Sequence, residues 1–498
     1  MSIRNLIKIS ENGDYDHLTD LMLASKFGND KNNFDIIKLI VQKNNNIYEI
    51  NKYGNTALMY AVGTANNIET VKYLILNGAN VNDRDNDDWT VLMYSVRHSN
   101  NDNMETVKYL IEKGANITSK DNIGRTVLEH ALNSSFSYNL GMIKYLLLKG
   151  VKINEKDKEG WTALMYASRN GNIKIVEYLV ENNANIDDQD ENGTCVLMYA
   201  LNRRNKEIVE YLVEKDVNVN AKDNKGKTIL MHVIISNNIE MAKYLIENGA
   251  NVNDKDNNGM TVLMYAHALR DTEFIEYLIE NEANVNDKDN KGKTILMDVV
   301  VDDNIKMLKY LVKCGANIND KDNDGCSVLT HVVKRTNNIE KLGYLIENGA
   351  NVNDKDINSW TSLRWAIYNQ DIGTIKYLLE NGADIDIKDN TGKTILEFVK
   401  EVCKNKEIIT YLENYENDMS NDLLIKANLK GNINMVKVLV KNNKKNNMID
   451  IIKLNNLEIL KIFLEFHKQV YNYKTVFEKI IEENVNEDVL DFIYNNSN

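Results

Sequence analysis

Between residues 51 and 415 the chain repeats one arrangement of apolar and polar positions about every 33 residues. In residues 157–190 a polar turn precedes an apolar block, Asn-Gly-Asn at 170–172 interrupts it, and apolar residues at helical spacing follow. This pattern predicts a first helix that Thr162 caps and that ends near Arg169. It predicts a second helix from about Ile173 to Glu181, so that each repeat consists of a turn and two helices.

The repeats also share a Thr-x-Leu-x-x-Ala core, in which some copies replace the Thr or the Ala, commonly preceded by Gly, as at residues 160–167. The Leu of the eleven copies stands at Leu58, Leu92, Leu128, Leu164, Leu197, Leu230, Leu263, Leu296, Leu329, Leu363 and Leu396. Successive copies are 33 or 34 residues apart, except for two steps of 36. A period near 33 with this core is the signature of ankyrin repeats, and the chain therefore resembles the ankyrin-repeat family.

The resemblance implies an all-α ankyrin-repeat solenoid of helix-turn-helix units with β-hairpin-type turns, in which neighbours share one core. We assign residues 51–415 to eleven ankyrin repeats and residues 1–50 to an N-terminal leader with a degenerate capping repeat. Residues 416–498 lack the hairpin phrase but keep helical patterns, and we interpret them as degenerate helical capping repeats. The absence of proline and the abundance of Asn, Lys and Ile are similar to ankyrin arrays of giant amoeba-infecting DNA viruses.

Charge and cysteine usage narrow the partners and the compartment. The net charge of −13 and the isoelectric point near 5.2 disfavour nucleic acid, because an acidic chain repels phosphate backbones. The sequence contains no apolar run of secretory or membrane-spanning length, so we expect no membrane partner. The four cysteines show no CxxC spacing, which favours a reducing, intracellular and cytoplasmic location, in the host cytoplasm if the protein is viral.

The sequence does not assemble a catalytic or cofactor site, and we predict neither an enzyme nor a cofactor. Two turns imitate calcium loops, at residues 320–325 and 254–259. A calcium-binding EF-hand needs a bidentate Glu at loop position 12, and here that position holds His331 and Tyr265. We therefore predict ordinary hairpin turns and no metal site.

Two recurring positions are candidates for partner binding. The position before the repeated Ala is mostly aromatic, and the resemblance implies that it points into a concave groove. Its members are Tyr60, Tyr94, His130, Tyr166, Tyr199, His232, Tyr265, Asp298, His331, Trp365 and Phe398. The hairpin position after Gly holds tryptophan at Trp89, Trp161 and Trp360. Aromatic residues are favoured as interface anchors. Rings that stack on one another explain the first position equally well, and a tryptophan that lies along the next hairpin explains the second position slightly better than partner binding does.

These features predict a monomeric, non-catalytic scaffold that binds a protein partner in the groove, a host protein if the chain is viral. The candidate contact residues are Tyr60, Tyr94, Tyr166, Tyr199, Tyr265, Trp365, Trp89, Trp161 and Trp360. An alternative is an adaptor whose C-terminal segment recruits effector machinery such as a ubiquitin ligase. Segments of that kind normally open on Leu-Pro, which this chain lacks.

Two local departures from the repeat carry further expectations. Glu282 stands where most repeats place Gly after the second helix, which predicts a strained left-handed residue. Two repeats carry three extra residues each between their helices, at about His98–Asn103 and Ser134–Asn139. Such insertions mark a binding edge or neutral drift.

Overall fold

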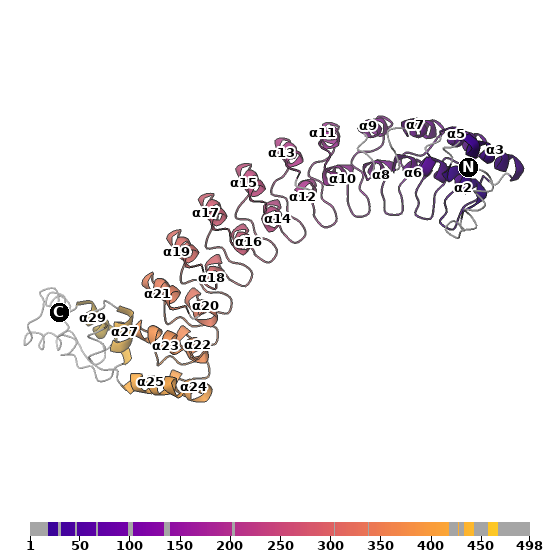
Figure 1. The fold of residues 1–498 in the computed structure, drawn as a ribbon. Coiled ribbons are helices and arrows are strands. Elements are labelled where there is room, and N and C mark those ends of the chain that lie inside the picture. The colour runs from indigo at the N-terminus through magenta and orange to yellow at the C-terminus, as the bar shows by residue number, and fades with distance from the viewer. Residues whose placement is uncertain are drawn as a thin grey trace, which may run out of the picture. The chain divides into compact units, whose positions relative to one another are not determined.

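The computed structural model describes residues 18–27, 31–44, 47–65, 68–97, 103–133, 140–201, 205–302, 304–336, 338–417, 427, 433–442 and 457–466. It divides the chain into two compact units, Met1–Asn257 and Asn258–Asn498. The boundary falls in the hairpin turn that precedes the seventh copy of the repeated phrase, whose Leu is Leu263. Each unit is a stack of helix pairs joined by hairpin turns (Figure 1).

In the first unit, the first helix of each pair lies beside the hairpin loops and the second helix lies on the far side of the pair (Figure 1). Its helices are α2 (Asp20–Lys26), α3 (Lys31–Asn44), α4 (Ala57–Tyr60), the π-helix η1 (Ala61–Ala65), α5 (Ile68–Leu76), α6 (Val91–Arg97), α7 (Met104–Glu112), α8 (Val127–Leu132), α9 (Leu140–Leu148), α10 (Ala163–Asn170), α11 (Ile173–Glu181), α12 (Val196–Leu201), α13 (Lys206–Glu214), α14 (Ile229–Ile235) and α15 (Ile239–Glu247).

The second unit repeats the same arrangement over most of its length. Its helices are α16 (Val262–Ala268), α17 (Thr272–Glu280), α18 (Ile295–Val299), α19 (Ile305–Lys313), α20 (Val328–Arg335), α21 (Ile339–Glu347), α22 (Ser362–Tyr368), α23 (Ile372–Glu380), α24 (Ile395–Val402), α25 (Lys406–Asn417), α27 (Ile433–Asn442) and α29 (Leu457–Phe466). At its C-terminal end, α27 packs against α29. Most of the predicted capping segment 416–498, and all but Asn103 of the two predicted insertions, lie outside the described residues.

Capping and amphipathic periodicity explain the helix pair α10–α11. Thr162 has an extended backbone, and its side chain accepts the backbone N–H of Met165 at the start of α10. Gly171, with φ of 83°, ends this helix in the left-handed conformation. In α11 the residues Ile175, Val176 and Leu179 are buried, which matches the 3.6-residue period.

An aspartate shapes most of the hairpin turns, as Asp157 shows. Its Oδ1 atom accepts the backbone N–H groups of Glu159 at 3.0 Å and Trp161 at 2.8 Å. Gly160 has φ of 83°, and a Cβ atom added there would lie 2.9 Å from the Cα atom of Asp190 in the next hairpin. Glycine is therefore required both for the conformation and for the close approach of neighbouring hairpins.

Neighbouring repeats are joined through polar side chains as well as through the core. The Nδ2 atom of Asn220 donates to the carbonyl oxygen of Gly249 at 3.0 Å, and its Oδ1 atom accepts the N–H of Asn251 at 2.7 Å. The ammonium group of Lys156 lies 3.1 Å from the carboxylate of Asp188 in the next repeat. Contacts of this kind link each repeat to its neighbour, as the nearest-neighbour energetics of repeat proteins require.

The strained position expected at Glu282 is confirmed, since its φ is 68°. The equivalent Asn183 and Asp216 are also left-handed, with φ of 65° and 60°. Asn and Asp tolerate this conformation better than the longer Glu side chain does. The strain is local to the turn that follows α17.

Candidate partner-binding face

The aromatic position of the first helix is bonded to the aspartate of its own hairpin, nine residues earlier. The hydroxyl group of Tyr166 donates to Asp157 Oδ2 at 2.8 Å, and that of Tyr199 donates to Asp190 Oδ2 at 2.6 Å. The indole nitrogen of Trp365 is a weaker donor to the hairpin aspartate of its own repeat, at 3.1 Å. In these three repeats the aspartate thus uses one oxygen to hold its turn and the other to tie that turn to the first helix.

The nine predicted contact residues differ in exposure. Tyr166 and Tyr199 are only 6% and 7% exposed, so their rings belong mainly to the core. The other seven are partly exposed, and they are Tyr60, Tyr94, Tyr265, Trp365, Trp89, Trp161 and Trp360. The first unit holds Tyr60, Tyr94, Tyr166, Tyr199, Trp89 and Trp161, and the second holds Tyr265, Trp360 and Trp365. No common surface across the two units is implied.

Burial and the aspartate bonds set the protonation of this position. Burial and the hydrogen bond to Asp157 raise the pKa of Tyr166 well above its ordinary value, so the hydroxyl keeps its proton and donates. Burial lowers the pKa of His130 despite its contact with Asp121. Burial acts to raise the pKa of Asp121, but hydrogen bonds from His130 and Arg125 outweigh it and lower this pKa to about 2. His130 and Asp121 therefore form a hydrogen bond at 2.9 Å between a neutral imidazole and a carboxylate.

The tryptophans at the hairpin tips, called here the fingertip tryptophans, are Trp89, Trp161 and Trp360. Each packs between the aromatic side chain on the first helix of its own repeat and the equivalent side chain of the next repeat. The Trp161 ring centroid lies 5.0 Å from that of Tyr166 and 4.2 Å from that of Tyr199. The Trp89 ring lies 4.2 Å from His130 of the next repeat. In the second unit Trp360 contacts Trp365 at 4.7 Å and Phe398 at 5.0 Å. The tryptophans are therefore half-buried members of ring stacks.

Cationic side chains cover the outer faces of these stacks. The guanidinium carbon of Arg97 lies 4.9 Å from the ring centroid of Trp89, and that of Arg169 lies 4.6 Å from the ring of Trp161. In the second unit the ammonium group of Lys334 lies 4.1 Å from the ring of Trp365. Such cation–π contacts place positive charge on the same side as the tryptophans.

A family model described as ankyrin repeats, in three copies, matches ten overlapping stretches of the chain. They are residues 3–85, 21–121, 64–157, 99–190, 132–223, 183–256, 218–289, 254–322, 296–389 and 363–450. Together they extend from residue 3 to residue 450. The chain belongs to the ankyrin-repeat family. No curated protein matched it.

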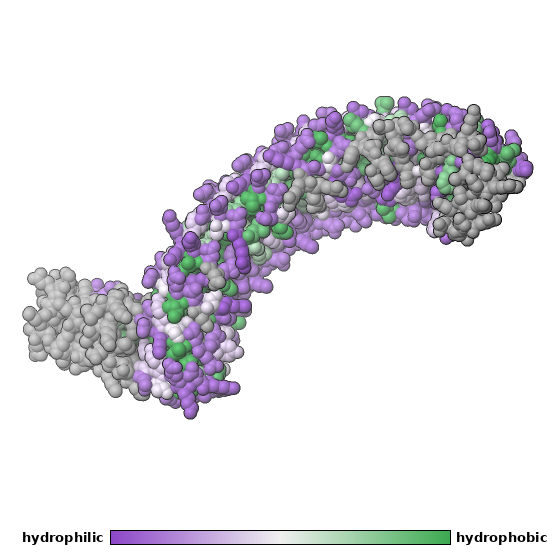
Figure 2. Space-filling view, in the orientation of Figure 1, coloured by the Kyte–Doolittle hydropathy of each residue, from purple (hydrophilic) through white to green (hydrophobic). Residues whose placement is uncertain are grey.

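Ankyrin repeats generally mediate protein–protein interaction, and proteins of this family are typically scaffolds without catalytic activity. In the part of the chain that the structure describes, no helix is long and apolar enough to cross a membrane. The same described residues contain no group of three or more His, Cys, Asp or Glu placed to hold a metal ion. Figure 2 shows that hydrophilic residues cover most of the visible ankyrin surface, with apolar residues in separate small patches.

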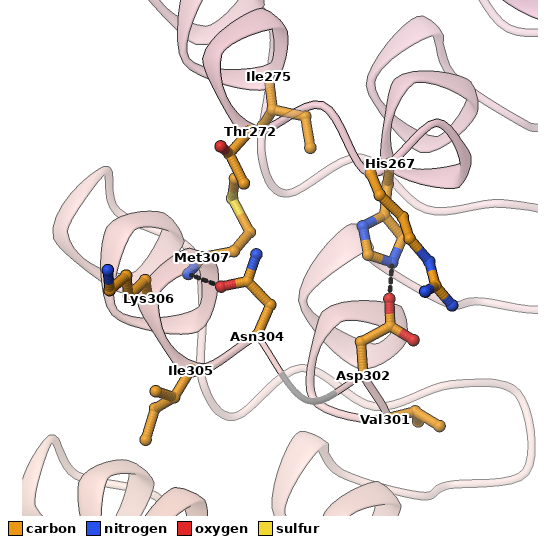
Figure 3. Close-up of a pocket in the computed structure, with 10 residues that line it drawn as sticks. His267, Thr272, Ile275, Val301, Asp302, Asn304, Ile305, Lys306 and Met307 are labelled. Carbon is orange, nitrogen blue, oxygen red and sulfur yellow. Dashed lines mark hydrogen bonds and ion pairs between the residues drawn. The ribbon is translucent and has the colours of Figure 1, made fainter.

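A cavity of about 570 Å³ lies between two ankyrin repeats of the second unit (Figure 3). It is lined by the ends and loops of α16, α17, α18 and α19, where His267 Nε2 lies 3.3 Å from Asp302 Oδ2. The fully buried ammonium group of Lys341 donates to the carbonyl oxygens of Val300 (2.9 Å) and Asp302, and so holds this loop. The cavity is open and mixed in polarity, without a set of convergent catalytic groups.

Sequence reasoning missed three features of this ankyrin array. The aspartate bond to the aromatic position is visible in retrospect as an Asp nine residues before that position in repeat after repeat. Arg97 and Arg169 share a second signal, since each follows its tryptophan by eight residues. The cavity has no sequence signal except Lys341, which stands at a helix position where α15 and α19 carry the buried methionines Met241 and Met307.

Proposed function

We propose that this protein is a non-catalytic ankyrin scaffold that binds a protein partner along the hairpin fingertips and first helices. The supporting observation is the half-exposed tryptophans at equivalent positions, each held in place by rings of its own and the next repeat. Rigid, partly exposed aromatic side chains lose little entropy on binding and are favoured as interface anchors. The composition that resembles viral ankyrin arrays makes a host protein of an amoeba the first partner to seek.

Tryptophan substitutions test this proposal better than tyrosine substitutions. Tyr166 and Tyr199 are buried and hydrogen-bonded to hairpin aspartates, so replacing them disturbs folding as well as any interface. The triple variant Trp89→Ala/Trp161→Ala/Trp360→Ala removes partly exposed rings instead. The matched control is Leu148→Ala, because Leu148 is 82% exposed and lies at the end of a second helix.

The experiment is affinity capture from amoeba lysate with quantitative mass spectrometry, together with circular dichroism melts of all three proteins. We expect a partner that the wild type and the Leu148→Ala variant enrich and that the folded triple variant loses. Equal capture by the triple variant and the wild type would refute binding through the fingertips. Loss from the Leu148→Ala variant alone would place the partner on the second helices.

The adaptor alternative concerns residues 416–498, of which the structure describes residues 416–417 at the end of α25, residue 427, α27 and α29. It stays a prediction from sequence. Deletion of 416–498 tests it, because an adaptor loses a second captured protein, such as a ubiquitin ligase subunit, while keeping the first. A deletion that changes only solubility supports the interpretation as capping repeats.

A further inference from the structure

Each tryptophan of the first unit contacts an arginine that forms no ion pair with any of the described residues. Arg97 is the last residue of α6 and Arg169 is in the last turn of α10. Each follows its tryptophan by eight residues, so the two sites are equivalent and two repeats apart. Both guanidinium groups rest on the indole of the same repeat.

Three other cations near this surface, Arg125, Lys120 and Lys156, form ion pairs within the chain. Arg125 lies on the same Trp89 ring at 5.6 Å, but its Nε and Nη2 atoms are both 2.9 Å from Asp121 Oδ2. The hairpin lysines Lys120 and Lys156 each bind an acid of the next repeat, at 2.6 Å and 3.1 Å. These three cations are thus paired within the chain.

Neither Arg97 nor Arg169 has a carboxylate within ion-pair distance among the residues that the structure describes. The Nη1 atom of Arg97 is shielded from solvent and has no hydrogen-bond partner. Burial and the nearby Arg125 lower the pKa of Arg97, although a guanidinium group remains charged at neutral pH. Arg169 makes a long hydrogen bond of 3.5 Å to the Oδ1 atom of Asn133. Neither of these two partly buried guanidinium groups therefore forms an ion pair with a described residue, in a protein whose net charge is −13.

We propose that Arg97 and Arg169 bind carboxylates of an extended acidic segment in the partner protein. This inference rests on the proposed function and specifies the chemistry of the partner. Guanidinium groups bind carboxylates through two parallel hydrogen bonds, and the flanking Trp89 and Trp161 rings offer apolar contact to the residues between. Two repeats span about 20 Å at a helix spacing of 8–10 Å, and an extended chain advances about 3.3 Å per residue. The two acidic residues therefore stand about six positions apart.

An acidic peptide fits this surface better than nucleic acid does. A nucleic-acid strand carries one negative charge per nucleotide and is repelled by the acidic protein as a whole. A short segment with two well-spaced carboxylates meets only the local positive charge. Single-stranded RNA is nevertheless the informative competitor, because its bases also stack on tryptophan and arginine.

The test is fluorescence anisotropy of the full chain with a labelled twelve-residue Gly/Ser peptide that carries two Glu residues about six positions apart. The matched peptide has Gln at the same places, and labelled oligouridine is the third probe. The protein variants are Arg97→Gln/Arg169→Gln, the charge-retaining Arg97→Lys/Arg169→Lys, and Arg84→Gln as a control. Arg84 is a hairpin arginine of the same unit that lies 3.7 Å from the carboxylate of Asp88. Thermal melts by circular dichroism confirm that each variant folds.

We expect the Glu peptide to bind more tightly than the Gln peptide, and to bind about tenfold more weakly for each arginine replaced by glutamine. The lysine variant should retain part of the affinity, the Arg84→Gln variant should match the wild type, and added salt should weaken binding. Equal affinity for the Glu and Gln peptides, or unchanged affinity of the Arg97→Gln/Arg169→Gln variant, overturns the inference. Tighter binding of oligouridine than of the Glu peptide also overturns it, in favour of nucleic acid.

Partner capture separates failure of this inference from failure of the proposed function. A partner that the tryptophan variant loses and the Arg97→Gln/Arg169→Gln variant retains leaves the scaffold function intact and refutes the role of the arginines. A partner that both variants lose, and that the Arg84→Gln variant keeps, supports both.

Discussion

A buried carboxyl group in the first unit makes the stability of this protein depend on pH. Glu129 of α8 is 1% exposed, and its Oε1 atom has no hydrogen-bond partner. Burial, opposed in part by hydrogen bonds from Thr126, raises the pKa of Glu129 from 4.5 to about 7. Seven repeats carry methionine at this position. The sulfur atoms of Met93 and Met165 each accept the backbone N–H of the N-cap threonine in their own repeat, at 3.4 Å.

The sign and size of the effect follow from the shift in pKa. Because the folded pKa of Glu129 lies above the unfolded value, the folded state holds the proton more tightly. The stability contributed by this group is fully present below about pH 4.5 and is lost as the pH rises through 7. A shift from 4.5 to about 7 corresponds to a loss of about 3 kcal/mol at alkaline pH.

The substitution Glu129→Met removes this loss and keeps an acceptor for the Thr126 N–H group. We therefore expect the variant to gain about 3 kcal/mol more, relative to wild type, at pH 8.5 than at pH 4.5. His130 titrates in both proteins, so its contribution largely cancels in the difference. The measurement is native-state hydrogen exchange of α8 and its neighbours at the two pH values, with urea unfolding by circular dichroism alongside.

A matched control is Glu397→Met, because Glu397 occupies the same repeat position in α24 but is exposed to solvent. It should show no gain at pH 8.5. A stability gap between Glu129→Met and wild type that is equal at both pH values, or larger at pH 4.5, would refute the argument from burial.

Four further substitutions test the backbone and the hairpin ties. Glu282→Gly should stabilise the second unit by about 0.5–1 kcal/mol, because glycine adopts a φ of 68° without strain; an unchanged or lower melting temperature would contradict this. Gly160→Ala and Gly249→Ala both meet the left-handed penalty of about 1–2 kcal/mol. Gly160→Ala should lose more in urea unfolding, because its Cβ meets the next hairpin at 2.9 Å while Gly249 has open space; equal losses would contradict the close approach. Tyr166→Phe should lose about 1.5–3 kcal/mol, because it removes the hydroxyl group that donates to Asp157 Oδ2, and faster hydrogen exchange in that hairpin is the measurement.

The repeat, the helices and their ends were determined by the sequence. The predicted second helix from Ile173 to Glu181 is α11, and the first helix starts after Thr162 and ends at Asn170, one residue beyond the expected end. These features depend on periodicity, on caps and on Gly or Asn turns, all of which act within a few residues of the chain. The strained Glu282 was predictable for the same reason, because a left-handed position penalises a long side chain wherever it occurs.

Only the tertiary structure decided which of the aromatic residues are available to a partner. Tyr166 and Tyr265 occupy the same repeat position, yet one is buried and the other is partly exposed. The tryptophans lie on rings that belong to the next repeat, as Trp89 does on His130. Burial and ring packing of this kind depend on residues that are more than 30 positions apart, and local sequence patterns do not specify how such residues meet. The binding roles of these residues remain predictions for the same reason, since they depend on a surface that the stacked repeats build together.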